Sequence, residues 1–509
     1  MVSTEVLVGQ MMGVGFEGLT PPDYLLEWLR AGRVGTVILF ARNISTPQQV
    51  AAMTRALHEA ATYGVIISID QEGGTVTRLR EGFTEFPSAM ALSSARNGEA
   101  LAEDVGIAIA EELRALGIGW NYAPVVDLLY NLDNPSLSTR SYGRDPEQVA
   151  VMASAFARGV QRGGAAACAK HFPGLGNTAV DTHVDLPTLA TPLEHVLAFD
   201  LIPYRAVIGA GIASIMATHT IYTALDPDYP ATLSPIVAKR LLREELHFDG
   251  VISTDCMEMG AITRHYGAGE SAVLAALAGM DSILFSHTRT VQEAAYAAVL
   301  NAVVSGRVPM DVVLDANRRM AALKARFSAP PGDLDVVRTP EHLRTAADAA
   351  RAGLCVVKAG AALPVTGSVA LVEFVSTLNS GIEEAGGLTG LGKALAARMP
   401  DARSMTLPPG TPLDAAETLV RAADTAVIAV RSAHLRPELI AAAQQLIGAA
   451  RRSVVICLRS PYDAVVLSDA DAILCTLGDT VPALEAAVAA LAGDFQPTSQ
   501  LPFELKAVT

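Results

Sequence analysis

The segment Lys170–Pro187 (KHFPGLGNTAVDTHVDLP) carries the residues most suited to chemistry. It leaves an apolar run at Lys170 and His171, turns through a proline and two glycines, and then places Asp181 two residues before His183. Glycine and proline at this density indicate a constrained loop. A carboxylate beside a histidine can accept a hydrogen bond from one ring nitrogen, fix the tautomer and stabilise the imidazolium. The pair therefore predicts a proton-transfer site, and a loop histidine bonded only for structure remains the alternative.

Three further segments place ionisable residues after apolar runs or at tight turns. They are VISTDCMEM with Asp255, IISIDQEGGTVTR with Asp70 and Arg78, and the stretch Trp120–Asp145 with Asp127 and Arg140. Taken singly, each of them fits a helix cap, a turn or a surface ion pair better than it fits a functional site.

The elements that must position these residues are short apolar runs, which alternate with helical patterns from residue 34 to about residue 327. The runs predicted as strands are Val34–Phe40, Gly64–Asp70, Ala165–Phe172, Ile212–Thr220, Gly250–Cys256 and Asp281–Ser286. Between them, segments such as Pro47–Tyr63 and Ser234–His247 repeat apolar residues at helical spacing. Continuous apolar strands separated by helices predict a parallel sheet that is buried on both faces.

Polar residues at the carboxyl ends of these runs favour one arrangement of the sheet. They are Arg42, Asp70, Asp127, Lys170, His171, His219 and Asp255. A (β/α)8 barrel places its active site on that rim, whereas a doubly wound sheet would concentrate such residues at one switch point. We therefore predict an α/β chain with a TIM-type catalytic barrel over residues 1–327.

Beyond the barrel, the Pro- and Asp-rich segment Ser328–Pro340 predicts a linker over residues 328–340. Strand–helix alternation then resumes and predicts a smaller α/β sandwich domain over residues 341–509. Its expected strands are Ser368–Phe374, Ala426–Val430, Ser453–Leu458 and Asp471–Leu477, with a helix at Pro437–Ala450. In this domain Gly387–Lys393 (GLTGLGK) satisfies GxxxxGK, but Ala394 follows where a P-loop needs a hydroxyl for Mg²⁺. A glycine-rich turn into a helix is the favoured interpretation.

Composition excludes several classes of protein. The 509-residue chain has a net charge of −15, which argues against a nucleic-acid partner because phosphate binding needs clustered Lys and Arg. The five cysteines form no CxxC pair and predict buried free thiols. Without a signal-peptide pattern or a long apolar window, the expected location is the cytoplasm, with no membrane span. A metal site at His171, Asp181 and His183 would lack HExxH spacing or a Cys cluster, so no metal or other cofactor is expected.

Taken together and in order, the motifs resemble the bacterial β-N-acetylglucosaminidase branch of glycoside hydrolase family 3. They are IDQEGGxVxR, NYAPVxDL, RSYGxDP, KHFPGLGxxxxDTH, PATLS and STDCMEM, and they cover essentially residues 5–327. The second unit and its ending, GDFQPTSQLPF, look like the family's C-terminal sandwich domain. The resemblance implies a small-molecule sugar substrate with a terminal, non-reducing β-linked N-acetylglucosamine, found in muropeptide fragments of the cell wall or in chito-oligosaccharides.

The resemblance also implies roles for individual residues. Asp255 matches the nucleophile that forms a covalent glycosyl-enzyme, His183 matches the general acid/base, and Asp181 matches its partner. Residues matching those that hold the −1 sugar are Asp70, Arg78, Arg140, Lys170 and His171. Retaining glycosidases usually pair two carboxyl groups, and here a histidine would replace one of them. Histidine, with an ordinary pKa of about 6.5, suits proton transfer near neutral pH.

Two alternative functions stay open. An N-acetylglucosaminide phosphorylase could use the same site, because a neutral histidine would not repel phosphate as a carboxylate would. A non-catalytic sugar-binding protein could keep the barrel, although the intact set Asp255, Asp181 and His183 argues against it. In the family's glucosidase branch the second domain supplies the acid/base. Here the barrel would supply it, so we expect the second domain to be structural or to shape the aglycone side.

Overall fold

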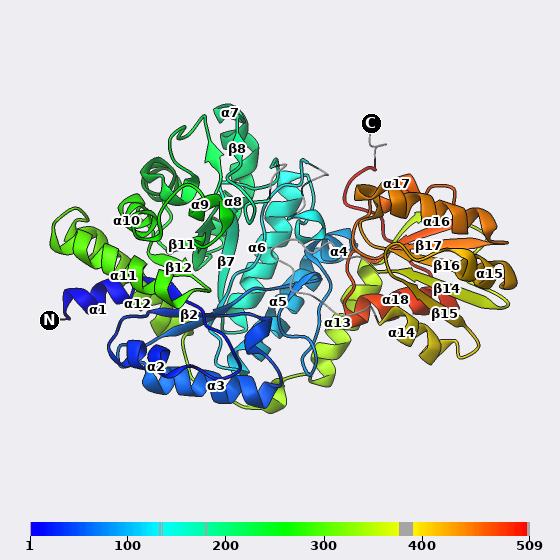
Figure 1. The fold of residues 1–509 in the computed structure, drawn as a ribbon, viewed down its shortest axis with the longest axis horizontal. Helices are drawn as coiled ribbons and strands as arrows, with labels where there is room; N and C mark the ends of the chain where they lie inside the picture. Colours follow the sequence, from blue (N-terminus) through cyan, green and yellow to red (C-terminus); the bar gives the residue numbers. More distant parts are fainter. Residues whose placement is uncertain (1, 132–133, 135, 179–180, 376–389, 506–509) are drawn as a thin grey trace.

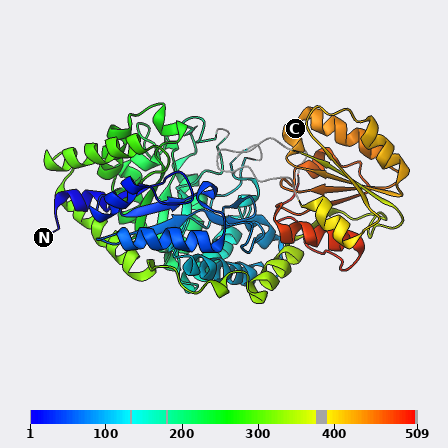
Figure 2. The same cartoon turned by 60° about the horizontal axis from the view of Figure 1, so that its bottom comes forward.

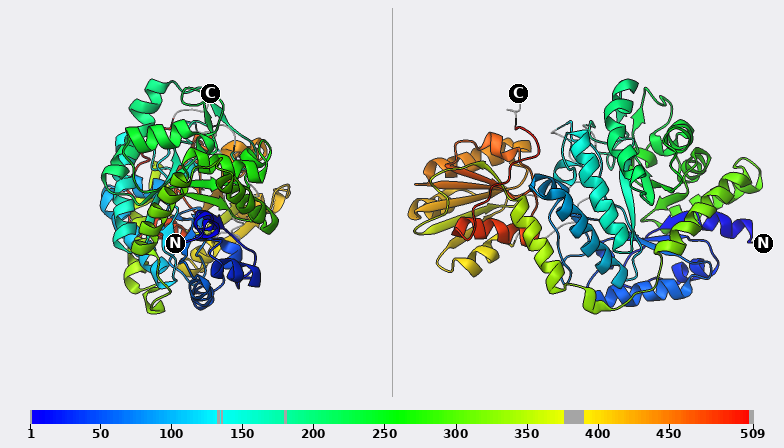
Figure 3. Two further views of the ribbon diagram at one scale, coloured as in Figure 1. Left: turned by 90° about the vertical axis from the view of Figure 1, so that its left-hand side faces the viewer. Right: turned by 180° about the vertical axis from the view of Figure 1, so that it is seen from behind.

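The computed structural model describes residues 2–131, 134, 136–178, 181–375 and 390–505 (Figure 1). An N-terminal barrel and a smaller C-terminal α/β unit lie side by side along the long axis of the molecule. The views in Figure 2 and Figure 3 show the same arrangement from below and from behind. The helix α13 (Pro340–Gly353) joins the two units and packs against helices of both.

Within the ranges that the structure describes, eight parallel strands close into a barrel in the order β1–β12–β11–β9–β7–β6–β3–β2. The strands are β1 (Met12–Val14), β2 (Thr36–Leu39), β3 (Ile66–Ile69), β6 (Trp120–Asn121), β7 (Ala166–Phe172), β9 (Ser214–Ala217), β11 (Val251–Cys256) and β12 (Ser282–Phe285). The predicted TIM-type barrel is therefore confirmed. A small hairpin of β4 (Gln71–Gly73) and β5 (Val76–Thr77) follows β3 on the rim.

Helices surround the barrel and connect its strands (Figure 3). The main ones are α2 (Asp23–Arg30), α3 (Pro47–Ala60), α5 (Gly98–Ala115), α6 (Pro146–Arg162), α8 (Leu201–Gly209), η5 (Ile236–Glu245), α10 (Ala268–Ala278), α11 (Arg289–Val304) and α12 (Met310–Phe327). A hydroxyl or carboxylate before a proline starts several of them. Thr46 before α3 and Asp145 before α6 accept hydrogen bonds from backbone N–H groups of the first turn.

The inside of the barrel is filled by side chains. Trp120 and Tyr122 pack there with residues of neighbouring strands, and Trp120 Nε1 donates a hydrogen bond of 2.7 Å to Ser214 Oγ. Met320 and Phe327 of α12 belong to the same cluster and close one end. Because the interior is a packed core, the chemistry has to lie at the carboxyl rim of the strands.

The second unit is a six-stranded sheet in the order β13–β18–β17–β16–β14–β15. Its strands are β13 (Cys355–Lys358), β14 (Val369–Phe374), β15 (Arg403–Leu407), β16 (Thr425–Val430), β17 (Ser453–Cys457) and β18 (Ala472–Cys475), and only β13 runs antiparallel to its neighbour. One face packs against α14 (Leu391–Arg398) and α18 (Val481–Ala492). The other packs against α15 (Asp414–Ala422) and α16 (Pro437–Ala449), and its core continues into barrel residues such as Met90 and Val125. The predicted α/β sandwich is confirmed.

The outer edge of β13 is covered by the chain as it returns near its end. Val356 N donates a hydrogen bond of 3.1 Å to Ser499 O, and Cys355 forms a parallel bridge with Ser499. At the opposite edge, β15 exposes polar side chains, Arg403 among them. Neither edge of the sheet is therefore a bare apolar strand.

All the strands predicted from apolar runs are present. Within the described residues, the barrel strands β1 and β6 and the sheet strands β13 and β15 were missed, as were the short strands of the two small two-stranded sheets. The domain boundaries 1–327, 328–340 and 341–509 stay a prediction. Part of the glycine-rich segment Gly387–Lys393 lies outside the described residues, and its remainder, from Gly390, begins α14. In the part of the chain that is described, no helix is long and apolar enough to cross a membrane.

Candidate active site

The carboxyl rim of the barrel brings the predicted residues together. Asp70 directly follows β3, and Lys170 and His171 lie in the last part of β7. Asp255 is the next-to-last residue of β11, and His219 follows β9. The interpretation of these positions as strand ends on one rim is thus confirmed.

Two carboxylates, Asp70 and Glu72, and three cations form a compact network on this rim. Lys170 Nζ lies 2.6 Å from Asp70 Oδ1 and 2.7 Å from Glu72 Oε1. Arg140 grips Glu72 with two hydrogen bonds, from Nε and from Nη2, each of 2.8 Å. Arg78 Nη2 lies 3.8 Å from Asp70 Oδ2. Glu72, to which the sequence assigned no role, is the centre of this network.

The network is ionised although it is buried. Burial alone would raise the pKa of Glu72, but Arg140 and Lys170 outweigh it and lower that pKa to about 2. Burial would likewise lower the pKa of Lys170, but Asp70 and Glu72 raise it. A buried ion pair of this kind is fixed in place, because loss of one partner leaves an unpaired charge.

His171 is oriented by Asp127, which has a fully buried carboxylate. His171 Nδ1 donates a hydrogen bond of 2.7 Å to Asp127 Oδ2. Leu175 N donates another to Asp127 Oδ1, also of 2.7 Å. Since Nδ1 is taken, the Nε2 atom of His171 is the ring nitrogen left to meet a ligand.

Asp181 and His183 pair as their spacing predicts. His183 Nδ1 and His183 N both donate to Asp181 Oδ1, over 2.7 Å and 2.9 Å. Burial would raise the pKa of Asp181, but the hydrogen bonds from His183 lower it to about 2. The His183 side chain is 25% exposed, so solvent can reach it. An ionised carboxylate thus orients a histidine that is accessible for proton transfer.

Asp255 stands where the pairing of β11 with β12 shifts register, between Ser253 and Cys256. Such a bulge redirects side chains at the end of a strand. Asp255 is partly exposed, and Cys256 N donates a hydrogen bond of 2.7 Å to its Oδ1. The N-cap of the following helix α9 (Gly260–Thr263) is Met259, so Asp255 does not cap that helix.

The carboxyl group of Asp255 is close enough to three histidines for their charges to affect it. Burial would raise its pKa, but His219, His171 and His183 together lower it below the ordinary value. His219 also supports the strand end, because its Nε2 donates a hydrogen bond of 2.9 Å to Cys256 O. The sequence placed His219 on the rim but gave it no role. Asp255 is therefore a carboxylate poised for electrostatic or nucleophilic work.

The loop that carries Asp181 and His183 is docked on the segment that follows Asp255. Gly260 N donates to His183 O over 3.2 Å, and Ala261 N donates to Thr182 O over 3.1 Å. There is no room for a side chain at Gly260, since a Cβ atom there would lie 2.6 Å from two carbonyl oxygens of the loop. The backbone after β11 thereby sets the position of His183.

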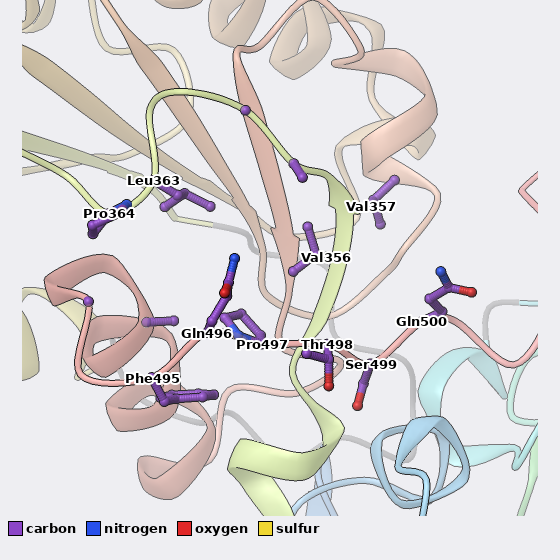
Figure 4. Close-up of a pocket in the computed structure, with 14 residues that line it drawn as sticks. Val356, Val357, Leu363, Pro364, Phe495, Gln496, Pro497, Thr498, Ser499 and Gln500 are labelled. Atoms are coloured by element: carbon purple, nitrogen blue, oxygen red, sulfur yellow. The ribbon is translucent and has the colours of Figure 1, made fainter.

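Two other kinds of site could carry a function, a metal site and a hollow in the second unit. Among the residues described, no group of three or more His, Cys, Asp or Glu side chains could hold a metal ion. A hollow of about 590 Å³ in the second unit lies between β13 and the returning chain (Figure 4). Its lining residues, Val356, Phe495 and Gln500 among them, include no titratable side chain. It therefore offers no group for acid–base chemistry.

An ionised carboxylate and histidines oriented by carboxylates, on the rim of a closed (β/α)8 barrel, suit the chemistry of a glycoside hydrolase. Comparison with known sequences makes this assignment specific. The family described as "Glycosyl hydrolase family 3 N terminal domain" matches residues 3–323. The chain belongs to glycoside hydrolase family 3, as its motifs predict.

Individual relatives cover the barrel or the whole chain. The chain is 39% identical over 290 residues to a beta-hexosaminidase of Pseudomonas aeruginosa, which covers 57% of this chain and 85% of that protein. A beta-hexosaminidase of Methylococcus capsulatus is 35% identical over 326 residues, covering 63% and 93%. The structure of a family 3 beta-N-acetylglucosaminidase from Paenibacillus sp. matches with a TM-score of 0.94 at 33% identity, covering 100% of both chains.

Proposed function

We propose that this protein is a retaining β-N-acetylglucosaminidase that releases a terminal, non-reducing β-linked N-acetylglucosamine. The observation that carries the proposal is the docking of the Asp181–His183 loop on the segment that follows Asp255. It holds an ionised carboxylate and an oriented histidine on one rim. The names of the relatives support N-acetylglucosamine as the sugar.

In the first step, Asp255 attacks the anomeric carbon while His183 gives a proton to the departing glycosidic oxygen. The lowered pKa of Asp255 supports this role, because only the carboxylate is a nucleophile. Asp181 stabilises the imidazolium that holds the proton, and its hydrogen bond to Nδ1 leaves Nε2 to transfer it. The product of this step is a glycosyl-enzyme on Asp255.

In the second step, the neutral His183 removes a proton from water as that water attacks the anomeric carbon. The bond to Asp255 then breaks, and the sugar leaves with its original anomeric configuration. Two inversions at one carbon give net retention, and the same histidine acts first as acid and then as base.

The −1 sugar would be held by the ionised network and by His171. Asp70 and Lys170 present charged oxygen and nitrogen atoms to sugar hydroxyls, and Arg78 stands beside Asp70. His171 presents Nε2, because Asp127 occupies its Nδ1 atom. Arg140 would not contact the sugar itself but would hold Glu72 in place, since its guanidinium already donates to Glu72 and to Ser136 O.

The proposal also covers the natural substrate and the location of the protein in the cell. Muropeptide fragments of the cell wall and chito-oligosaccharides both carry the required terminal sugar. A cytoplasmic location is supported by the five buried free cysteines, which suit a reducing compartment. Release of N-acetylglucosamine from each purified oligosaccharide, followed by chromatography, would identify the better substrate.

The proposal is tested with a 2-fluoro-sugar that traps the glycosyl-enzyme, followed by peptide mapping. We expect the label on Asp255, and we expect Asp255→Ala to hydrolyse an aryl β-N-acetylglucosaminide about a thousandfold more slowly or worse. Asp185→Asn is the matched control, because Asp185 is an exposed carboxylate that pairs with His265 away from the reacting atoms. Equal rates for wild type and Asp255→Ala would refute the nucleophile.

The acceptor can be tested in the same assay. Water is the proposed acceptor, and the phosphorylase alternative requires phosphate to take the sugar. Added phosphate should therefore leave the turnover rate unchanged and yield no sugar 1-phosphate. Formation of N-acetylglucosamine 1-phosphate would replace the hydrolase proposal by the phosphorylase one.

A further inference from the structure

A turn of the second unit lies against the hairpin that carries Glu72 of the ionised network. The turn is Thr476–Asp479, directly after β18, and the hairpin is β4–β5. A Cβ atom on Gly478 would lie 3.7 Å from Gly74 Cα, at the tip of the hairpin. Beside this contact, Ser88 Oγ donates a hydrogen bond of 2.6 Å to Leu477 O. The two segments are about four hundred residues apart in the chain, yet they lie next to each other.

The turn is rigid. Leu477 is completely buried and has a φ of 57°, a conformation that bulky residues rarely adopt. Thr476 Oγ1 lies 2.7 Å from Gly478 O and closes the turn. Strained backbone of this kind persists only where the surroundings determine it, and it gathers at functional sites.

On its other side, the hairpin is packed closely against the segment Phe86–Ser88. Gly74 N donates a hydrogen bond of 2.8 Å to Phe86 O. Added Cβ atoms would lie 2.6 Å from Pro87 O at Gly73 and 2.5 Å from Ser88 Cβ at Gly74. If a side chain on the turn pushed Gly74, the hairpin could not give way locally and would shift. Such a shift would move Glu72, in β4, and Arg78, which follows β5.

Charged side chains also lie on both sides of this contact. Asp479 lies 3.0 Å from Arg459 Nε and 3.3 Å from Arg431 Nε, within the second unit. On the barrel side of the contact, Arg80 pairs with Glu85 of the same unit over 2.9 Å. Burial raises the pKa of Glu85, Arg80 opposes this, and the charge of Asp479 raises it further, so these groups are close enough to interact.

We propose that the second unit is a positioning element for the −1 sugar pocket, with Gly478 and Asp479 as its positioning residues. The turn holds the β4–β5 hairpin so that Glu72 and Arg78 keep their geometry around Asp70 and Lys170. This inference rests on the proposed function for the identity of the sugar. It assigns the second unit to the sugar side of the site rather than to the aglycone side.

The test compares Gly478→Leu with Gly478→Ala in the full-length chain. The alanine Cβ makes an ordinary contact at 3.7 Å, so its kinetics should match those of wild type. The leucine side chain must push the hairpin, so we expect KM for an aryl β-N-acetylglucosaminide to rise about tenfold or more, with kcat changed much less. Gly448→Leu controls for an added leucine, because Gly448 has open space around it in the same unit.

Hydrogen exchange supplies a second measurement that does not depend on activity. Backbone amides of residues 71–78 should exchange about tenfold faster in Gly478→Leu than in Gly478→Ala. If the leucine variant fails to fold, Asp479→Asn takes its place, with the same directions for KM and exchange. Unchanged exchange in a folded variant, or faster exchange with an unchanged KM, would overturn the proposal. A wild-type protein inactive on this substrate would refute the proposed function, while the exchange rates still decide whether the turn holds the hairpin.

Discussion

Replacing Asp181 by asparagine tests proton transfer by His183 apart from sugar binding and from the packing of the loop. The substitution keeps the size of the side chain and an oxygen that can accept from His183 Nδ1, but it removes the charge that stabilises the imidazolium. A step that needs a proton from His183 should become slower. A step that needs no such proton should keep its rate.

The size of the effect follows from the ionisation of Asp181. Its pKa is about 2, against an ordinary value of 3.8, and that difference is worth about 2.5 kcal/mol. The Asp181–His183 hydrogen bonds supply most but not all of the lowering, and His183 is 25% exposed, so solvent reduces the coupling to about 1–2 kcal/mol. The proton-dependent step should then slow by about 5- to 30-fold.

The assay compares two leaving groups. For methyl β-N-acetylglucosaminide, whose alcohol needs protonation, kcat/KM of Asp181→Asn should fall by the full factor. For the 2,4-dinitrophenyl glycoside, whose leaving group departs unprotonated, kcat/KM should stay close to that of wild type. Asp185→Asn on the same loop is the control and should affect neither substrate. An equal fall for both substrates would refute a role in proton transfer and indicate a misplaced loop.

Three other changes test the supports of the site. Gly260→Ala places a Cβ atom 2.6 Å from two carbonyl oxygens of the acid/base loop, so kcat/KM should fall about tenfold, whereas Gly267→Ala has open space and should match wild type. Glu72→Gln leaves two buried cations underneutralised and should lower the free energy of unfolding in urea by about 3–5 kcal/mol at neutral pH. Because the pKa of Glu72 is about 2, below its ordinary 4.5, this stabilisation is complete above pH 4.5 and disappears as the pH falls towards 2, where the two proteins should converge. For His342, burial would lower the pKa, but two glutamates of α5 raise it above the ordinary 6.5. Its stabilisation is therefore present below pH 6.5 and lost at higher pH, so the difference in Tm between wild type and His342→Gln should shrink as the pH rises, and a constant difference would contradict this.

The residues on the rim of the barrel could be predicted from the sequence because a strand end is marked locally, where an apolar run gives way to polar residues. Lys170, His171 and Asp255 all stand at the carboxyl end of apolar runs, and parallel strands bring such ends together. The hydrogen bond between Asp181 and His183 could also be predicted, since only one residue separates them and they lie on a constrained loop.

The features that were missed depend on contacts between distant segments. The strands β1 and β6 contain only three and two residues, so no apolar run marks them, and their pairing follows from closure of the barrel. Glu72 joins Arg140, 68 positions away, and Lys170. A single acidic residue in a glycine-rich turn gives no sign of such partners.

The returning segment over β13 has a consequence for how the chain behaves in a crowded solution. An open sheet presents hydrogen-bonding groups at both margins, and another molecule can add a strand to either one. In this sheet Ser499 already pairs with β13, and the opposite margin carries the exposed Arg403. The returning segment thus caps one margin of the sheet, and the charge at the other margin opposes the addition of a strand from another molecule.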